Sequence, residues 1–326
     1  MRCEAVRGVP ALSALEREWW RLFRAAPSPA PFQSPAWLLP WCRHLGPADI
    51  LAVQVQDHAE LVGLVSFSIT KKGAERVLRP LGSGVTDICD GLTAPGYERE
   101  VAASVVATLL DEPGWDRCAW DGLPSSSPYA QAIEEQLHAS RSEEIAPVLA
   151  IGTDARALVE AIPPSMAANL HACRKRAERM GGLLMRIPAP AECERFLDAL
   201  FALHAARWRS GGEQGVLGHA AVQAFHREAL PALMEEGLAR VHLVEVGERV
   251  AAAHYGFAAR GRHYYYIGGF DPELRAAGPG HLAVAHAIER AISERAELFH
   301  FLRGDEPYKR RWGAEPTPLA TLSFRR

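Results

Sequence analysis

Hydrophobic and polar residues follow one another along the chain in patterns that predict helices and strands. In the first half, apolar residues recur every three or four positions over 12–25 and 35–45, which is the spacing of a helix with one buried face. Short apolar runs bounded by polar turns predict strands at 50–55, 61–69, 76–81 and 116–120. Two more helices are expected at 101–110 and 129–139.

The second half repeats this order of elements. Helical spacing covers 155–181, where two consecutive prolines interrupt it, and returns at 193–207 and 221–236. Strands are expected at 183–187, 241–246, 250–258, 263–267, 298–302 and 319–324. A helix at 281–295 and a short helical segment at 308–312 separate the last three of these strands.

The chain is expected to form two domains. A change to polar residues, with a proline and a glycine, separates the two series of elements near 146–154. We therefore expect domains at residues 1–150 and 151–326, each of the α+β class, with a mixed, mostly antiparallel sheet flanked by helices. No sequence repeat is visible, so the two halves resemble one another only in the order of their elements.

Composition restricts the classes of protein to which the chain can belong. With 326 residues, 48% of them hydrophobic, the chain can bury two cores. A net charge of -3 argues against a general nucleic-acid binder, so DNA is not an expected partner. No run of ~20 apolar residues and no signal-peptide core is present, which predicts a cytoplasmic protein without a membrane span. The six cysteines include no Cys-x-x-Cys pair, so no metal site is expected.

The sharpest chemical signal is a glycine-containing loop before the helix at 281–295. Residues 275–280 read Arg-Ala-Ala-Gly-Pro-Gly. Glycines at a helix entrance let the backbone approach an anion closely, and the unpaired N–H groups of the first turn then face that anion. The loop predicts a phosphate or pyrophosphate site, and a plain strand–turn–helix junction is the alternative. The spacing fits neither a P-loop nor the dinucleotide-binding fingerprint.

This loop resembles the acyl-CoA pyrophosphate loop of GNAT N-acyltransferases, Arg/Gln-x-x-Gly-x-Gly/Ala between the fourth strand and a helix. Three further segments look like the CelD-type acetyltransferases linked to cellulose and other exopolysaccharide synthesis: 250–257, 264–271 and 301–313. The last of them reads Phe-Leu-Arg-Gly-Asp-Glu-Pro-Tyr-Lys-Arg-Arg-Trp-Gly. Residues 31–38 are similar to the N-terminal region of that family. The resemblance implies two tandem GNAT-like domains with acetyl-CoA as acyl donor.

Two departures from the family pattern affect what the resemblance implies. His300 stands where the family often has an acidic residue, which puts any role of that carboxylate in doubt. The first half has no counterpart of the loop, since residues 94–97 follow no Arg/Gln-x-x-Gly. The N-terminal domain is therefore expected to lack its own acyl-CoA site. The same tandem arrangement occurs in the Fem peptidyltransferases, which use aminoacyl-tRNA and supply the nearest rival interpretation.

The resemblance assigns candidate catalytic groups. Tyr308 fits the tyrosine that protonates the departing CoA thiolate in GNAT enzymes, and packing of its ring on the sheet is the alternative. His254 and Asp305 are candidates for the base that deprotonates the amine. A hydrogen-bonded structural histidine and a turn-capping aspartate are the corresponding alternatives.

Candidate binding residues flank these groups. For acyl-CoA they are Arg275, Gly278, Pro279 and Gly280, with backbone N–H groups near Gly268 and Gly269 stabilising the oxyanion. For the acceptor they are Asp271, Lys309 and Trp208. Arg310 and Arg311 could likewise attract phosphates. The basic stretch at 171–179 could bind RNA or an anionic saccharide, although a solvated helix face is the stronger interpretation.

Together these signals predict transfer of an acyl group from acetyl-CoA to a primary amine. The acceptor is expected to be a small-molecule amine or an amino sugar such as a nucleotide sugar, attacked directly without a metal or a covalent intermediate. One alternative is a Fem-type aminoacyl-tRNA-dependent ligase, for which the basic stretch around Arg174 is the hint. The other is a non-catalytic GNAT-like binding protein, suggested by His300.

Overall fold

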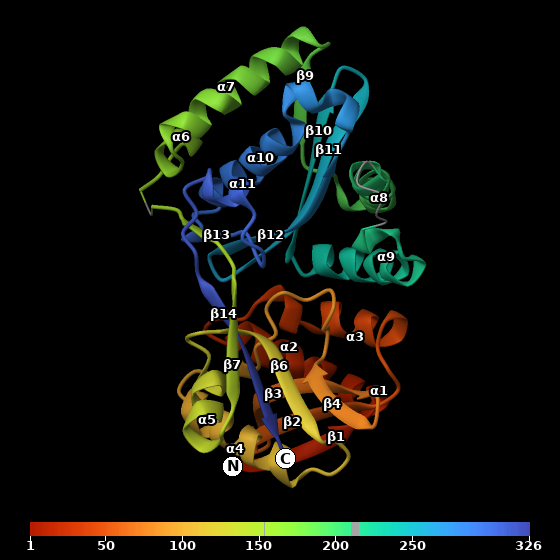
Figure 1. Ribbon diagram of the computed structural model, residues 1–326, viewed down its shortest axis with the longest axis vertical. Coiled ribbons are helices and arrows are strands. Elements are labelled where there is room, and N and C mark those ends of the chain that lie inside the picture. Colours follow the sequence, from red (N-terminus) through yellow and green to blue (C-terminus); the bar gives the residue numbers. More distant parts are fainter. Residues whose placement is uncertain (153, 210–214) are drawn as a thin grey trace. The chain divides into compact units, whose positions relative to one another are not determined.

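The computed structural model describes residues 1–152, 154–209 and 215–326, which form two compact units. Unit 1 comprises Met1–Ile145 and Pro318–Arg326, and unit 2 comprises Ala146–Thr317 (Figure 1). Each unit contains one mixed sheet flanked by helices. The expected fold class, two α+β domains that each have a mixed sheet flanked by helices, is confirmed.

The sheet of unit 1 has the strand order β1-β2-β3-β4-β6-β14-β7, with β5 paired to β3. Its strands are β1 (Arg2–Arg7), β2 (Ile50–Asp57), β3 (Glu60–Lys72), β4 (Glu75–Pro80), β5 (Leu92–Thr93), β6 (Arg117–Pro124), β7 (Ser140–Ile145) and β14 (Pro318–Arg325). Its helices are α1 (Val9–Ser13), α2 (Glu16–Ala25), η1 (Pro31–Gln33), α3 (Pro35–His44), α4 (Glu98–Asp111) and α5 (Pro128–Gln136).

The core of unit 1 forms where α4 and α5 pack on the sheet. Val101, Val105 and Leu109 recur along one face of α4 and are fully buried, as the spacing of the apolar residues predicts. From the strands, Phe67 and Trp120 meet edge to face with ring centroids 4.8 Å apart.

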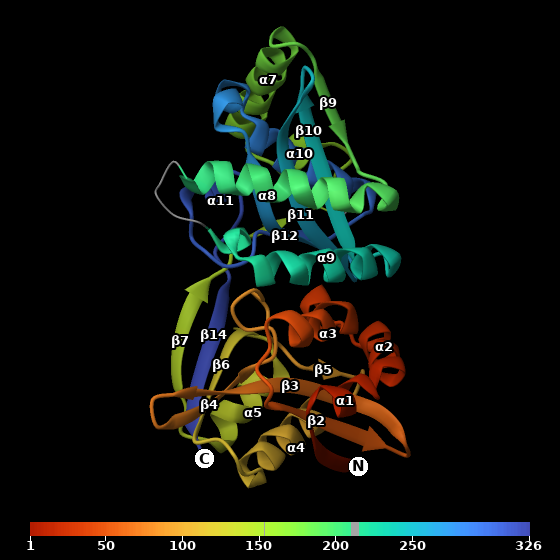
Figure 2. The ribbon, with the colours of Figure 1, turned by 90° about the vertical axis from the view of Figure 1, so that its right-hand side faces the viewer.

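The sheet of unit 2 has the strand order β8-β13-β12-β11-β10-β9. Its strands are β8 (Val148–Ala150), β9 (Leu183–Arg186), β10 (Ala239–Val246), β11 (Arg249–Ala259), β12 (Arg262–Phe270) and β13 (Leu298–His300). Its helices are α6 (Leu158–Ala161), α7 (Pro164–Arg179), η2 (Pro190–Glu192), α8 (Cys193–Arg209), η3 (Val216–Gly218), α9 (Ala220–Glu235), η4 (Pro272–Ala277), α10 (Pro279–Ser293) and α11 (Pro307–Arg310). Helices α8 and α9 cover one face of this sheet and α7 and α10 the other (Figures 1 and 2).

The central strands β12 and β13 separate partway along the sheet of unit 2. They pair in parallel only from Arg262 to Tyr264, opposite Leu298–His300. Strand β12 then continues to Phe270 beside β11, while the chain leaves β13 and reaches α11. The edge of β12 beyond Tyr264 is thus free of β13, and it leads to the start of α10.

The last strand does not belong to the domain in which the sequence placed it. Residues 319–324 were expected to end the domain 151–326, but β14 pairs with β6 and β7 of unit 1. The apolar residues of β14 predict a strand with a buried face, and this pattern is the same in either sheet. The division between the units falls between Ile145 and Ala146, and β7 and β8 flank it.

Four short strands were not expected from the sequence: β1, β5, β7 and β8. Strand β7 reads Ser-Arg-Ser-Glu-Glu-Ile and lies at the edge of its sheet, so its mostly exposed side chains show no apolar alternation. In the part of the chain that the structure describes, no helix has both the length and the apolar character needed to cross a membrane.

Candidate functional site

A pocket of about 270 Å³ opens in unit 2 where β12 and β13 have diverged. It is formed by the end of β12, by η4, by the first turns of α10, and by α11 with the turn after it. The lining residues are Tyr265, Phe270, Arg275, Gly278, Pro279, Gly280, His281, Val284, Tyr308 and Trp312. The structure therefore brings the predicted loop and Tyr308 to a single cavity, although about 30 residues separate them in the sequence.

The first turn of α10 forms one wall of this pocket. Gly278 precedes it in the left-handed conformation, at φ 63° and ψ 43°, and offers no side-chain cap. Pro279 has no N–H, and no acidic side chain occupies the first turn. The His281 N–H donates to the Gly278 carbonyl at 3.0 Å, so the first turn offers an anion the Gly280 N–H and the positive end of the helix dipole.

The two glycines of this wall serve different purposes. A Cβ at Gly278 would lie 2.4 Å from Cys173 Sγ of α7, so this glycine is required by packing as well as by its backbone conformation. A Cβ at Gly280 would meet only the ring of Phe270, at 3.6 Å. Gly280 therefore leaves open the space that a ligand would fill.

Arg275 supplies a cation at the same wall. Its side chain is exposed, and among the described residues it forms no ion pair. By contrast, Arg249 and Arg310 pair with Asp271 and Asp305, respectively. The charge of Arg275 is thus available to a ligand phosphate.

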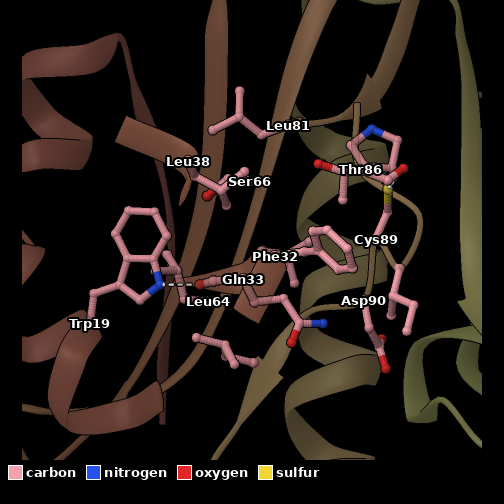
Figure 3. Close-up of a pocket in the computed structure, with 14 residues that line it drawn as sticks. Trp19, Phe32, Gln33, Leu38, Leu64, Ser66, Leu81, Thr86, Cys89 and Asp90 are labelled. Atoms are coloured by element: carbon pink, nitrogen blue, oxygen red, sulfur yellow. Dashed lines mark hydrogen bonds between the residues drawn. The ribbon is translucent and has the colours of Figure 1, made fainter. Parts of the chain in front are cut away.

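Unit 1 offers no comparable helix entrance at α4. The first turn of α4 carries Glu98 and Glu100, whose charges oppose an anion. A pocket among β3, η1 and the segment after β4 holds only about 20 Å³, which is room for one water (Figure 3). Trp19 fills one side of it and donates a hydrogen bond to the Gln33 carbonyl at 2.8 Å (Figure 3). A second pocket of unit 1, of about 300 Å³, lies between α4 and α5. The absence of an acyl-CoA site from unit 1 stays a prediction.

Two aromatic residues of the 308–312 segment form the opposite wall. Tyr308 is partly buried against the core of unit 2, and the Trp312 side chain is completely buried. The Trp312 indole N–H has no acceptor within the described parts of the chain. A buried donor without a partner is rare in folded proteins, and at a pocket wall it suits a ligand oxygen.

His281 is a pocket residue that the sequence analysis missed. It follows the predicted loop directly and lines the cavity, with its ring centroid 6.4 Å from that of Trp312. Burial, and then the charge of Arg311, lower the pKa of His281, so the imidazole is neutral at pH 7 and able to accept a proton. Its position directly after the predicted loop could have indicated that it lies at the same site.

His254 lies next to the pocket rather than in its lining. Its ring stacks on Tyr265 with centroids 4.7 Å apart and an angle of 25° between the planes. Both ring nitrogens are buried without a hydrogen-bond partner in the described chain. Burial, followed by the charges of His286 and His263, lowers the pKa of His254 to about 3. It is therefore a neutral imidazole in contact with a pocket residue.

Lys309 and Asp305 do not face the pocket. Lys309 was expected to bind substrate, but its side chain is only 3% exposed and its Nζ lies 2.9 Å from a Glu306 carboxylate oxygen. Nζ also donates to the backbone carbonyls of residues 302, 303 and 304, at 3.3, 2.6 and 3.1 Å. Asp305 was expected as a base, and Arg310 binds both of its carboxylate oxygens. Both charges are therefore committed to the loop between β13 and α11.

Asp271 and Trp208 also interact with residues outside the pocket lining. Asp271 caps η4 by accepting the Glu273 N–H at 2.9 Å, and it pairs with Arg249. Trp208 lies on α8, across the sheet from α10, and donates to His204 Nε2 at 3.0 Å. Neither residue lines the pocket, so their expected contact with the acceptor has no support from this cavity.

Gly268 and Gly269 occupy the part of β12 paired with β11. A Cβ at Gly269 would lie 2.5 Å from the His204 backbone nitrogen, so this glycine allows α8 to pack on the sheet. A Cβ at Gly268 would lie 2.8 Å from the hydroxyl of Tyr265. Close packing thus explains why both positions are glycine. Their expected role at an oxyanion remains a prediction.

His300 holds the end of β13. Its Nδ1 accepts the Leu302 N–H at 2.9 Å, and Leu302 has a left-handed backbone with φ 58°. Burial, and then the charges of Lys309 and Arg262, lower the pKa of His300 to about 4. The residue that departs from the family pattern therefore shapes the loop that leads to Tyr308.

Comparison with known proteins finds a domain match within unit 2. Residues 164–310 match the family model described as an acetyltransferase (GNAT) domain. A search of curated proteins finds no match.

Solved structures extend the similarity to both units. FemX is 11% identical with a TM-score of 0.70, covering 98% of this chain and 97% of its own. L-PGS from Bacillus licheniformis is 11% identical with a TM-score of 0.55, covering 81% of each chain. A tandem GNAT protein from the clavulanic acid biosynthesis pathway is 13% identical with a TM-score of 0.53, covering 99% and 98%. At these identities the likeness is one of fold.

Proposed function

We propose, from the premise that residues 164–310 form a GNAT acetyltransferase domain, that this protein transfers an acyl group from acyl-CoA to a primary amine. Acetyl-CoA is the simplest donor. One observation carries the proposal: a single pocket joins the open first turn of α10 to Tyr308. The first feature suits the diphosphate of the donor and the second suits its departing thiolate.

The walls of the pocket suggest how the donor would be held. The diphosphate would lie against the backbone at Gly280, with Arg275 beside it. The edge of β12 that is free of β13 offers backbone hydrogen-bonding groups to the extended amide chain of the donor. The thioester would then lie near Tyr308.

The chemistry proposed is direct attack by the neutral amine on the thioester carbonyl. The carbonyl oxygen gains negative charge, which backbone N–H groups of β12 would stabilise. When the C–S bond breaks, Tyr308 gives its proton to the thiolate. A base must take a proton from the amine, and His281 is the neutral imidazole that lines the pocket. His254, the other candidate histidine, does not line the cavity, so we assign the proton transfer to His281.

The acceptor proposed is a small-molecule amine or an amino sugar, including a nucleotide sugar. This part of the proposal rests on the resemblance of 250–257, 264–271 and 301–313 to the CelD-type acetyltransferases, which also suggests a link to exopolysaccharide synthesis. Fold similarity to solved structures cannot identify the acceptor, because one fold serves many substrates.

A Fem-type aminoacyl-tRNA-dependent ligase is the second candidate. The observation that favours it is the likeness to FemX, which extends over 98% of this chain and therefore over both units. The open helix end and the free arginine of the pocket would accept tRNA phosphates as readily as those of CoA. Only the donor separates the two candidates.

Titration with the two donors tests the proposal. Isothermal calorimetry should show one acetyl-CoA bound per chain, because the pocket of unit 2 has an open helix entrance and α4 of unit 1 has an acidic one. Two equivalent sites would contradict this expectation. Binding of aminoacyl-tRNA without acetyl-CoA would establish the second candidate, and stabilisation by neither donor would favour a non-catalytic protein.

Replacement of Gly280 by valine tests the position of the diphosphate. The valine side chain would enter the pocket and keep a ligand away from the backbone, so acetyl-CoA affinity should fall at least tenfold, which is about 1.4 kcal/mol. The helix should tolerate the change, since valine is no worse than glycine in a helix. Calorimetry gives the affinity, and circular dichroism gives the melting temperature.

A Gly278→Ala protein is the matched comparison. Its new methyl group would collide with Cys173 in a left-handed backbone position, so loss of stability should accompany any loss of binding. A folded Gly280→Val protein that binds acetyl-CoA with unchanged affinity would move the diphosphate away from α10.

A further inference from the structure

Asp90 of unit 1 is a carboxylate that the proposed reaction does not use. It lies in the segment between β4 and β5, is half-buried, and lines two cavities of about 20 and 60 Å³. The smaller cavity is the one shown in Figure 3, where Trp19 and Asp90 lie on opposite sides. Leu92 also lines both cavities, so they meet at this segment of the chain.

Only one oxygen of the Asp90 carboxylate is bound by the protein. Its Oδ1 accepts the Ser127 hydroxyl at 2.7 Å and the Gly91 N–H at 2.9 Å. Ser127 in turn caps α5 by accepting the N–H groups of Tyr129 and Ala130. Oδ2 accepts no hydrogen bond and forms no ion pair within the described chain. One half of the carboxylate thus supports the start of α5, and the other half is left unpaired at the cavities.

The negative charge of Asp90 has no positive counterpart at these cavities. Burial raises the pKa of Asp90 to about 6, and the hydrogen bonds from Ser127 and Gly91 offset this effect only in part. In the part of the chain that the structure describes, no lysine, arginine or histidine lines either cavity, whereas Glu98 lines the larger one. Above about pH 6 the carboxylate is therefore ionised at a place where a bound cation would neutralise it.

The size and lining of the two cavities fit one kind of cation. The smaller cavity has room for about one water-sized group, which matches an –NH3⁺ group. Trp19 gives it an aromatic wall, which favours a cation over a neutral group of the same size. Three prolines, Pro27, Pro29 and Pro128, give the larger cavity an apolar lining that suits a short alkyl chain.

We propose that unit 1 binds a primary ammonium group on a short alkyl chain, with the ammonium at Asp90 Oδ2 and the chain along the prolines of the larger cavity. This site gives unit 1 a binding function of its own, directed at a cationic ligand rather than at an anionic one. Because every residue involved belongs to unit 1, the site is independent of the acyl transfer proposed for unit 2.

Binding of n-butylammonium to the whole chain tests this site, with 1-butanol as the uncharged ligand of similar length. Isothermal calorimetry at pH 8 should detect one bound butylammonium, and 1-butanol should bind at least about tenfold more weakly, because only the cation pairs with Asp90. At pH 5 butylammonium should bind about tenfold more weakly than at pH 8, since a carboxyl group with a pKa of about 6 is then roughly nine-tenths protonated. The ligand itself keeps its charge over this range.

Asp90→Asn separates the charge from the shape of the side chain. The amide keeps an oxygen that can accept from Ser127, so α5 should stay capped, but the affinity for butylammonium should fall at least about tenfold and no longer depend on pH between 5 and 8. Asp111→Asn is the matched control, because Asp111 is exposed at the end of α4 and lines neither cavity. Its affinity should equal that of the parent.

Three results would overturn the proposal. The first is a parent protein that binds butylammonium no better than 1-butanol, or binds neither. The second is an equal affinity for butylammonium at pH 5 and pH 8, and the third is an Asp90→Asn protein that binds it as Asp111→Asn does. Each would confine Asp90 to the support of α5 through Ser127. The first two are measured on the parent, so they decide the question even if Asp90→Asn does not fold.

Discussion

A Tyr308→Phe protein should bind acetyl-CoA with nearly the parent affinity and turn over ~10²–10⁴-fold more slowly, the usual effect of removing a general acid. The substitution deletes one oxygen and keeps the ring, which packs against the core of unit 2. Binding should therefore persist, while the departing thiolate must take its proton from water. Single-turnover rates with saturating amine would measure the chemical step directly.

Tyr265→Phe is the control for this experiment. Tyr265 lines the same pocket, but its ring stacks on His254 and we give it no proton to transfer. Its variant should retain turnover within a few-fold of the parent. If Tyr308→Phe keeps the parent rate when chemistry limits turnover, Tyr308 has no part in proton transfer. Weaker binding with unchanged turnover would instead identify it as a donor contact.

A Lys309→Met protein should lose about 2–4 kcal/mol of stability, because hydrogen bonds from a charged group are each worth about 1.5–3 kcal/mol and their loss leaves buried carbonyls unpaired. Methionine matches the length of the lysine side chain but cannot donate to the carbonyls of residues 302, 303 and 304. The loop that ends at Tyr308 should loosen, so turnover should fall as well. Urea unfolding followed by tryptophan fluorescence would measure the first effect.

Arg310→Ala provides the comparison for this second experiment. Arg310 is the next residue, and its pair with Asp305 is exposed, so its removal should change stability by no more than about 1 kcal/mol. A Lys309→Met protein that is as stable as Arg310→Ala would show that the buried ammonium does not hold the loop. Lys309 would then have to be reconsidered as a substrate ligand.

Local patterns account for what the sequence predicted of this fold. The strands at 241–246 and 250–258 and the helix at 281–295 are long, regularly patterned segments, and they appear close to their expected bounds as β10, β11 and α10. The loop at 275–280 was recognisable because a helix entrance for an anion depends on neighbouring residues alone. Its meeting with Tyr308 in one pocket depends on the divergence of β12 and β13.

The errors concern side chains whose partners lie elsewhere in the chain or across a loop. Lys309 looked like a surface cation in a basic run, but the turn at Leu302 folds three carbonyls around it. His281 was overlooked because a histidine on a helix gives no local sign that it faces a cavity. For β14, the alternation of apolar residues predicts a strand, but it does not indicate which of the two sheets the strand joins.

The placement of β14 reverses the order in which the two units can be completed during synthesis. Residues 1–145 leave the ribosome first, but β6 has no partner on one side and β7 has no neighbour until residues 318–325 have been made. All of unit 2 is translated in between, and it can fold while the sheet of unit 1 still exposes an open edge. The unit that begins first therefore finishes last, and during that interval the uncovered edge of β6 is open to pairing with another nascent chain.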